Sequence, residues 1–365
     1  MQPTTSHHIG PGILGVCGAL PDHRYPQARL TEAFAEFAGL DGPRRRLLER
    51  VHGHAGVHFR HLALPVEQYA ELGDFGDAND AFITTACDLG QAAVGEVLEV
   101  ASVPPDEVDM IITASTTGLA VPSIDARIAP GLGLRPDVKR VPIVGLGCAA
   151  GAAGIARAAD YLAGHPDQIV VLVTVELCTL TLQRDDRSTA NLIASGLFGD
   201  GAAAVVLAGR DRVMSADRPS RSPEVVATRS RLYPESLRVM GWDVGPTGLQ
   251  IVLGAEIPEL VHSELAKDID VFLADQDLSR ADIDWWVCHP GGPKVLEAVQ
   301  DTLDLRDGEL QLTWDSLAEI GNLSSASVLH VLDDTLRTRP PQPGAYGLML
   351  ALGPGFSLEL VLLRG

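Results

Sequence analysis

Cysteine is scarce in this chain, and long apolar runs are absent. Only five cysteines occur among 365 residues, and no two of them have C-x-x-C spacing. An odd number of scattered cysteines argues against a disulfide framework or a cysteine zinc site and favours a reducing cytoplasm. The longest apolar run, residues 169–182, is interrupted by Glu176 and falls short of the roughly 20 residues that span a bilayer. We therefore expect a cytoplasmic protein without a signal peptide or membrane insertion.

Basic residues are also few. The chain has 28 lysines and arginines against 48 acidic residues, a formal net charge of −20. This balance argues against binding of nucleic acid or anionic membranes through a broad basic face. The apolar share of 46% is sufficient for a large core. The length corresponds to about two domains, or to one large duplicated domain.

Short β-rich apolar runs alternate with longer stretches of helical pattern. The expected strands are 110–114, 169–175, 202–207, 285–288, 347–351 and 358–363. The expected helices are 28–40, 78–100, 148–163, 256–275, 292–304 and 323–337. This alternation is typical of an α/β fold with layered sheets and helices.

Two motifs recur in the same order in the two parts of the chain. The segment 103–109 and the strand after it resemble 278–284 and the strand after it, 175 residues later. The motif Gly199-Asp-Gly201 resembles Gly353-Pro-Gly355, 154 residues later. Chance similarity of common turns is the alternative, but two pairs in one order favour an internal duplication. The polar segment 209–223 is the natural boundary, which predicts halves of residues 1–220 and 221–365.

Cys148 lies where a strand turns through two glycines into an alanine-rich helix. A cysteine at a helix N-terminus is near the positive end of the helix dipole, which favours the thiolate. The turn also leaves backbone N–H groups free to bind an oxyanion. A buried structural cysteine is the alternative. A dinucleotide-binding loop is disfavoured because Ala150 stands where G-x-G-x-x-G requires its third glycine.

Two further side chains occupy comparable positions. His289 follows the strand 285–288, and α/β folds place reactive groups at the C-terminal ends of strands. Asn322 lies 175 residues after Gly147, at the duplicated copy of the cysteine turn. A helix N-cap is the alternative role for this asparagine. If the halves pack face to face, one thiol, one imidazole and one amide meet in a pocket suited to acyl transfer without hydrolysis.

Together these motifs resemble the type III polyketide synthases, the chalcone synthase-like branch of the thiolase fold, and within it the bacterial alkylpyrone and alkylresorcinol synthases. The matching segments fall within residues 10–363. They are Gly15-Val-Cys-Gly-Ala-Leu-Pro21 with His23-Arg-Tyr25, the turn around Cys148, Leu197-Phe-Gly-Asp-Gly201, His289-Pro-Gly-Gly-Pro293, Gly321-Asn-Leu-Ser-Ser325 and Gly353-Pro-Gly355. The resemblance implies a thiolase fold, in which duplicated α/β halves form a five-layered α-β-α-β-α architecture. It also implies a homodimer.

The resemblance further implies the reaction. Cys148 would accept an acyl group from coenzyme A as a thioester, and His289 would support the Cys148 thiolate. His289 and Asn322 would bind the thioester carbonyl of malonyl-CoA and stabilise the enolate formed by decarboxylation. The enolate would attack the acyl-Cys148 thioester in a Claisen condensation, repeated until the chain cyclises. Coenzyme A thioesters are the substrates, and no metal, flavin or nicotinamide cofactor is required.

The same resemblance assigns substrate-binding positions. Phe198 matches an aromatic gatekeeper between the coenzyme A tunnel and the cavity, for which a core phenylalanine is the alternative. Ile251 stands where the family has a second aromatic ring, which widens the passage. The other cavity positions hold mainly small or medium side chains, namely Thr116, Val121, Cys178, Thr181, Ser324, Gly353, Pro354 and Gly355. Because each buried CH₂ contributes roughly 0.8 kcal/mol, this lining favours a fatty acyl starter and alkylpyrone or alkylresorcinol products.

Coenzyme A binding is expected at a basic helix. Arg50 matches one of the family's basic positions there, whereas the other two hold Leu47 and His54. Arg46 belongs to a run of three arginines that lies one turn earlier and could bind the same phosphates. A solvated basic helix face is the alternative.

Other functions fit parts of the Cys/His/Asn set. An initiating ketoacyl-ACP synthase, which performs a single condensation, shares the three residues, but its histidine is typically followed by Gln-Ala-Asn rather than Pro-Gly-Gly. A thiolase-fold protein that only binds acyl groups needs no nucleophile. A papain-like hydrolase has its cysteine near the mature N-terminus, and a duplicated α/β pattern does not suit it.

Overall fold

The structure is a computed structural model that describes residues 10–215 and 222–365. Within these residues, nine strands form one sheet in the order β11-β12-β13-β8-β1-β7-β6-β4-β5. They are β1 (Gly12–Ala19), β4 (Met110–Ala114), β5 (Lys139–Ile143), β6 (Ile169–Leu177), β7 (Asp200–Ala208), β8 (Glu224–Leu232), β11 (Ile283–Cys288), β12 (Tyr346–Gly353) and β13 (Ser357–Arg364). Two small antiparallel pairs lie outside it: β2 (His23–Pro26) with β3 (Phe59–Leu62), and β9 (Met240–Gly245) with β10 (Gly248–Leu253).

The helices of the described residues include every helix that the sequence predicts. They are α1 (Gln27–Phe37), α2 (Gly42–Gly53), α3 (Phe75–Ala101), α4 (Ile124–Leu132), α5 (Ala150–Gly164), α6 (Thr189–Leu197), α7 (Arg210–Ser215), α8 (Ile257–Ala274), α9 (Pro293–Leu303), α10 (Gln311–Ile320) and α11 (Ser327–Thr338). Short 3₁₀ turns lead into two of them: η3 (Gly147–Ala149) into α5 and η6 (Ser324–Ala326) into α11. No helix of the described residues is both long and apolar enough to cross a membrane.

The strand topology confirms the duplication. In the first half β4, β6, β7 and β1 lie side by side, and in the second half β11, β12, β13 and β8 lie in the same order. The first pair of each set is parallel and the next two pairs are antiparallel. The predicted matches therefore fall on equivalent strands, β4 with β11 and β7 with β13. The predicted boundary between residues 220 and 221 lies outside the described residues.

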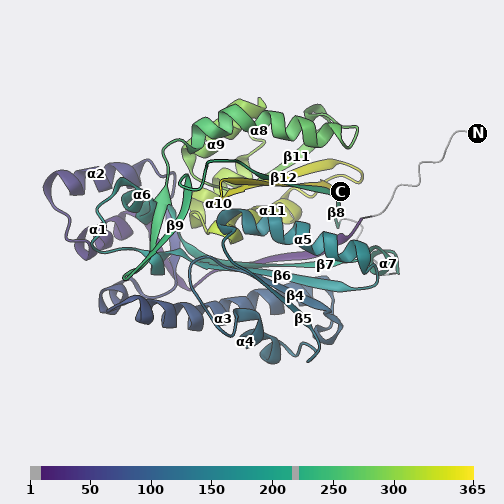
Figure 1. Cartoon of the computed structure of the whole chain (residues 1–365), viewed down its shortest axis with the longest axis horizontal. Helices are drawn as coiled ribbons and strands as arrows, with labels where there is room; N and C mark the ends of the chain where they lie inside the picture. Colours follow the sequence, from purple (N-terminus) through teal and green to yellow (C-terminus); the bar gives the residue numbers. More distant parts are fainter. Residues whose placement is uncertain (1–9, 216–221) are drawn as a thin grey trace, which may run out of the picture.

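Five layers follow from this repetition (Figure 1). α8 and α9 cover the outer face of the second half, α3 and α4 cover the outer face of the first half, and α5 and α11 lie between the two sets of strands. The buried strand residues alternate accordingly: Val171 and Val173 of β6 pack toward α3, whereas Val170 and Leu172 join the central core with α5 and α11. Strands buried on both faces explain the continuous apolar runs in the sequence.

The central helix α5 begins at the cysteine turn and approaches its neighbours closely. A side chain at Gly151 would lie 2.4 Å from the Ser325 carbonyl oxygen, and one at Gly154 would lie 2.5 Å from Leu172. Only glycine permits these distances. The glycines of α5 thus bring the cysteine turn against η6, which is its duplicated counterpart.

Candidate active site

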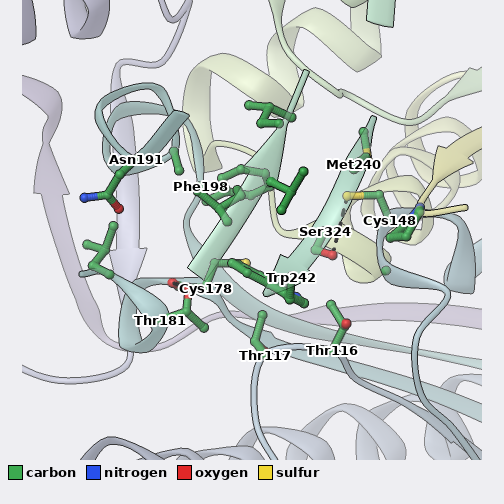
Figure 2. Close-up of a pocket in the computed structure, with 18 of the residues that line it drawn as sticks. Thr116, Thr117, Cys148, Cys178, Thr181, Asn191, Phe198, Met240, Trp242 and Ser324 are labelled. Atoms are coloured by element: carbon green, nitrogen blue, oxygen red, sulfur yellow. Dashed lines mark hydrogen bonds between the residues drawn. The ribbon is translucent and has the colours of Figure 1, made fainter. Parts of the chain in front are cut away.

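Cys148 lies in the 3₁₀ turn between β5 and α5. Gly147 precedes it with a φ of +49°, and a side chain there would meet the Pro354 ring at 2.6 Å. Both constraints require glycine at this position. The Cys148 side chain is buried and its Sγ donates a hydrogen bond to Ser324 Oγ, 3.5 Å away (Figure 2).

Asn322 lies just before η6, the counterpart of the cysteine turn. Its side chain is almost fully buried, and its Oδ1 accepts a 2.8 Å hydrogen bond from the backbone N–H of Ser324. This bond fixes the amide, so that Nδ2 is the group left to donate. Ser324 therefore contacts both the Cys148 thiol and the Asn322 amide.

His289 begins the turn after β11. Its backbone N–H donates to the Leu350 carbonyl of the parallel strand β12 at 3.0 Å. The imidazole is 4% exposed, and its Nδ1 has no hydrogen-bond partner among the described residues. Because burial disfavours the charged ring, the pKa of His289 is lowered to about 3.

Contacts between neighbouring residues link the three segments that carry Cys148, His289 and Asn322, although only Cys148 of the three lines the pocket described below. The parallel strands β11 and β12 end there together, so His289 and the loop with Pro354 leave on the same side. Pro354 packs against Gly147, next to the nucleophile candidate. The backbone N–H of Asn322 donates to the Leu197 carbonyl at 2.9 Å, and the Leu197 side chain packs against Gly292 of the histidine turn.

Burial dominates the protonation of the thiol. It raises the pKa of Cys148 to about 12, while the hydrogen bond to Ser324 lowers the pKa and the nearby Glu176 carboxylate raises it. Burial thus opposes the thiolate that the helix N-terminus was expected to favour. A proton acceptor is needed to activate this thiol.

Glu176 is a buried acid beside the site that the sequence analysis did not assign. Its carboxylate accepts hydrogen bonds from Ser325 Oγ at 2.6 Å, Thr117 Oγ1 at 2.9 Å and the Thr116 N–H at 3.0 Å. Burial raises its pKa above the ordinary value. The signal in the sequence was the one acidic residue that interrupts the longest apolar run.

A pocket that is partly open to solvent lies beside Cys148 (Figure 2). It is lined by most of the predicted substrate positions: Thr116, Cys178, Thr181, Phe198, Ile251, Ser324 and Pro354. Its larger remaining lining residues, which the sequence analysis missed, are Leu182, Asn191, Met240 and Trp242. The indole of Trp242 lies between Cys148 and Cys178 in this view, so the cavity holds more bulk than the predicted lining.

The structure corrects the prediction for Val121. This side chain is 96% exposed and does not line the cavity of its own chain. The two glycines of the 353–355 loop are also outside the cavity lining. Gly353 packs against Ala149, directly behind the cysteine turn, and Gly355 approaches Leu232.

Arg46 and Arg50 lie on α2 with exposed side chains, and neither forms an ion pair with a described residue. They remain available for an anionic ligand. Among the described residues, no group of three or more His, Cys, Asp or Glu side chains is placed to hold a metal ion.

Comparison with known proteins agrees with this architecture. The family model for the N-terminal domain of chalcone and stilbene synthases matches residues 6–211, and that for the C-terminal domain matches residues 224–365. A 1,3,6,8-tetrahydroxynaphthalene synthase from Streptomyces peucetius subsp. caesius is 52% identical over 97% of this chain and 93% of that protein. A putative chalcone synthase from Bacillus subtilis is 38% identical over 96% of this chain and 97% of that protein.

A solved structure extends the match to three dimensions. The 1,3,6,8-tetrahydroxynaphthalene synthase of Streptomyces coelicolor superposes with a TM-score of 0.90 at 28% identity, covering 97% of this chain and 99% of that chain. That protein is a bacterial type III polyketide synthase. Of the two condensing enzymes that the Cys/His/Asn set suggested, the matches support the polyketide synthase. The chain belongs to the chalcone and stilbene synthase family and is a type III polyketide synthase, an acyltransferase that condenses coenzyme A thioesters with decarboxylation.

Proposed function

We propose that this synthase starts from a short acyl-CoA, malonyl-CoA included, and releases a small aromatic polyphenol. The observation that carries the proposal is the bulk of Trp242 and Phe198 in the cavity beside Cys148, which shortens the space for a starter. The relative at 52% identity supports it, since its name denotes a tetrahydroxynaphthalene without an alkyl chain.

A fatty acyl starter with alkylpyrone or alkylresorcinol products is the second candidate. It is favoured by a further cavity that shares Thr117, Thr181 and Leu182 with the one beside Cys148. Movement of these side chains would join the two spaces and give a long alkyl chain room. The starter thus depends on which space the acyl group enters.

In the proposed mechanism His289 takes the proton of the Cys148 thiol. The thiolate attacks the thioester carbonyl of the starter, coenzyme A leaves as the thiol, and an acyl-Cys148 thioester remains. The buried imidazole supports this role, since its Nδ1 has no partner among the described residues and the ring is neutral, the form that accepts a proton. The transfer creates a thiolate and an imidazolium together, and their mutual attraction offsets part of the cost of two charges in the buried site.

Condensation then uses His289 and Asn322 together. Both donate hydrogen bonds to the thioester carbonyl oxygen of malonyl-CoA, and loss of CO₂ leaves an enolate whose charge they stabilise. The enolate carbon attacks the acyl-Cys148 carbonyl, a C–C bond forms, and the Cys148 thiolate is released. The support is the Asn322 amide, whose Oδ1 is occupied by the Ser324 N–H and whose Nδ2 is left to donate.

Product mass spectrometry tests the starter. The purified enzyme is given malonyl-CoA alone and then malonyl-CoA with acyl-CoA starters from acetyl to palmitoyl. We expect an aromatic polyphenol from malonyl-CoA alone, with little incorporation of long chains. Preferred incorporation of long chains into pyrones or resorcinols would instead establish the second candidate.

Substitutions of the cavity wall should shift the starter in opposite directions. Trp242→Ala opens space and is expected to favour longer starters, by roughly fourfold for each additional buried CH₂ group. Ile251→Phe narrows the passage and is expected to favour shorter ones. The kcat/KM for each starter measures the shift. Unchanged starter profiles in both variants would contradict the argument from cavity size.

We also propose a homodimer. Support comes from the apolar side chains Leu119, Val121 and Val144, which are 49%, 96% and 67% exposed, and from β5, the exposed end strand of the sheet. Contiguous exposed apolar surface marks an interface. Val121 would then reach the cavity of the other copy, which reconciles its exposure with its predicted lining role.

Val121→Asp should dissociate this dimer, because an unpaired carboxylate buried in an interface costs several kcal/mol. Light scattering after gel filtration measures the molar mass. Val100→Asp, a change of the same kind on the outer face of α3, is the control and should stay dimeric. A Val121→Asp variant with the mass and activity of the unmodified protein would refute this interface.

Coenzyme A is proposed to bind at α2 through its phosphates, with Arg46 and Arg50 as cationic partners. Support comes from the two exposed guanidinium groups, which stand out in a chain of net charge −20. A cytoplasmic location is likewise proposed, on the basis of five cysteines that are all unpaired.

A further inference from the structure

The junction between α6 and β7 carries Phe198, the expected gatekeeper, and holds Asn322, the proposed donor to the enolate. The backbone N–H of Asn322 donates to the Leu197 carbonyl at 2.9 Å, and the N–H of Gly199 donates to the Asn322 carbonyl at 3.0 Å. These bonds form a short parallel bridge between Phe198 and Asn322. The position of the Asn322 amide therefore depends on the position of this junction.

Arg60 is the side chain that fixes the middle of the junction. It extends from β3, is 2% exposed, and its Nη1 donates to the Phe198 carbonyl at 2.8 Å. Its Nε donates to Gln27 Oε1 at 3.0 Å. The aliphatic stem packs against Gly321, where a side chain would lie 3.0 Å from the Arg60 Cγ. Arg60 thus contacts both chain segments of the bridge.

Other buried polar groups hold the rest of the junction. Gln27, whose Oε1 accepts from Arg60, also donates through its Nε2 to the Gly196 carbonyl at 2.7 Å. His52 lies 3.1 Å from Ser195 Oγ. Asp200 accepts from the backbone N–H groups of Ala63 and Thr179 at 2.6 and 2.8 Å. Both sides of Phe198 are therefore anchored, and Arg60 supplies the bond to Phe198 itself.

Burial of the charged Arg60 guanidinium costs desolvation free energy, which its hydrogen bonds have to offset. Burial lowers the pKa of Arg60 to about 10, and the Asp200 and Tyr69 side chains only partly offset this effect. A residue that merely filled space could be apolar and avoid the desolvation penalty. The planar guanidinium donates to Phe198 and Gln27 at the same time, in a fixed geometry that a lysine does not reproduce.

We propose that Arg60 is a positioning residue for the decarboxylation and condensation steps. It fixes the Phe198 carbonyl, the bridge transmits that position to Asn322, and the amide of Asn322 is thereby held where the enolate oxygen forms. The inference rests on the role proposed above for Asn322. The loading of Cys148 relies on His289 and not on the Asn322 amide, so the proposal does not extend to that step.

Arg60→Lys tests the proposal, since it keeps the charge and the aliphatic stem but loses the planar pair of donors. We expect kcat for malonyl-CoA decarboxylation to fall about 10²-fold, the cost of a misplacement near 1 Å. The KM for malonyl-CoA should change less than about threefold, because binding is not the step that is lost. Acylation of Cys148, followed by intact-protein mass spectrometry, should stay within about threefold of the unmodified enzyme.

A control and two further measurements keep the outcome decisive. Arg29 lines the same cavity as Arg60 and pairs with the exposed Glu67. Arg29→Lys should leave the kcat and KM for malonyl-CoA decarboxylation and the acylation of Cys148 unchanged. Arg60→Ala should regain decarboxylation with millimolar guanidinium, which reaches the site through that cavity. Should the alanine variant fail to fold, Gln27→Met removes one acceptor of Arg60 and should lower kcat in the same direction by less.

The outcomes separate the inference from the proposed function. If the unmodified enzyme does not decarboxylate malonyl-CoA, the proposed function fails, and the positioning role of Arg60 in decarboxylation fails with it. If the unmodified enzyme does decarboxylate malonyl-CoA, two results refute the positioning role of Arg60. One is an Arg60→Lys enzyme in which decarboxylation and Cys148 acylation are lowered equally, and the other is one in which neither is lowered. An Arg60→Lys enzyme that loads Cys148 normally but decarboxylates slowly supports it.

Discussion

Cys148→Ala is expected to abolish chain extension while malonyl-CoA decarboxylation continues. Without the thiol no acyl-enzyme can form, so extended products should fall by a factor on the order of 10⁴ or more, the scale of losing a covalent nucleophile. Decarboxylation requires only the donors proposed on His289 and Asn322, which this variant keeps. Liquid chromatography of products and release of CO₂ from malonyl-CoA measure the two activities separately.

Cys87→Ala is the matched control, because Cys87 is a partly buried thiol on α3, away from the cavity. It should form product at the normal rate and still acquire an acyl group from the starter. Extended products from the Cys148→Ala enzyme would show that another residue is the nucleophile. Loss of product in the Cys87 variant would point to a general effect on folding.

Asn322→Asp is expected to give the second largest loss. The carboxylate still accepts the hydrogen bond from the Ser324 N–H, but it replaces the donor with a negative charge that repels the enolate. Removal of one hydrogen-bond donor to the enolate lowers kcat about 10²- to 10³-fold. Repulsion between the new carboxylate and the enolate should lower kcat further. Decarboxylation and condensation should fall together, whereas acylation of Cys148 should persist.

Gln342→Glu, an equivalent change of an exposed amide in the loop before β12, should leave both reactions unchanged. Stopped-flow loading and steady-state decarboxylation give the comparison. A normal decarboxylation rate in Asn322→Asp would remove the asparagine from the mechanism. It would also leave the Phe198–Asn322 bridge with a structural role only.

The fold could be predicted because its signals are local and repeated. The runs at 110–114 and 285–288 each follow the same Asp-bearing turn, and both proved to be parallel strands of equivalent position. The elements that were missed have weak patterns. α2 is polar on most of its surface, with Leu48 and His52 as its buried residues, and the β9 hairpin alternates glycine with bulky residues.

The site was predictable where a residue's role is set by its own turn. Cys148 and Asn322 occupy duplicated turns, and the structure brings both to Ser324. Val121 and Trp242 depend on tertiary placement instead. Val121 is aligned with a cavity position but points away from its own chain, and Trp242 reaches the cavity from a hairpin whose sequence gives no indication of that direction.

Arg60 shows a similar limit. From the sequence, an arginine in a four-residue strand is expected at the surface, because isolated charged side chains are almost never buried. Its burial depends on partners that lie 33 and 138 residues away in the chain. Such a contact becomes visible only when distant segments of the first half are folded together.

The most direct test of the account is peptide mass spectrometry of the enzyme quenched during turnover with ¹³C-labelled malonyl-CoA. If chains grow as proposed, the peptide containing Cys148 will carry a series of labelled adducts that differ by one two-carbon ketide unit. A series on another residue, or a single unextended adduct on Cys148 throughout turnover, would contradict the central claim.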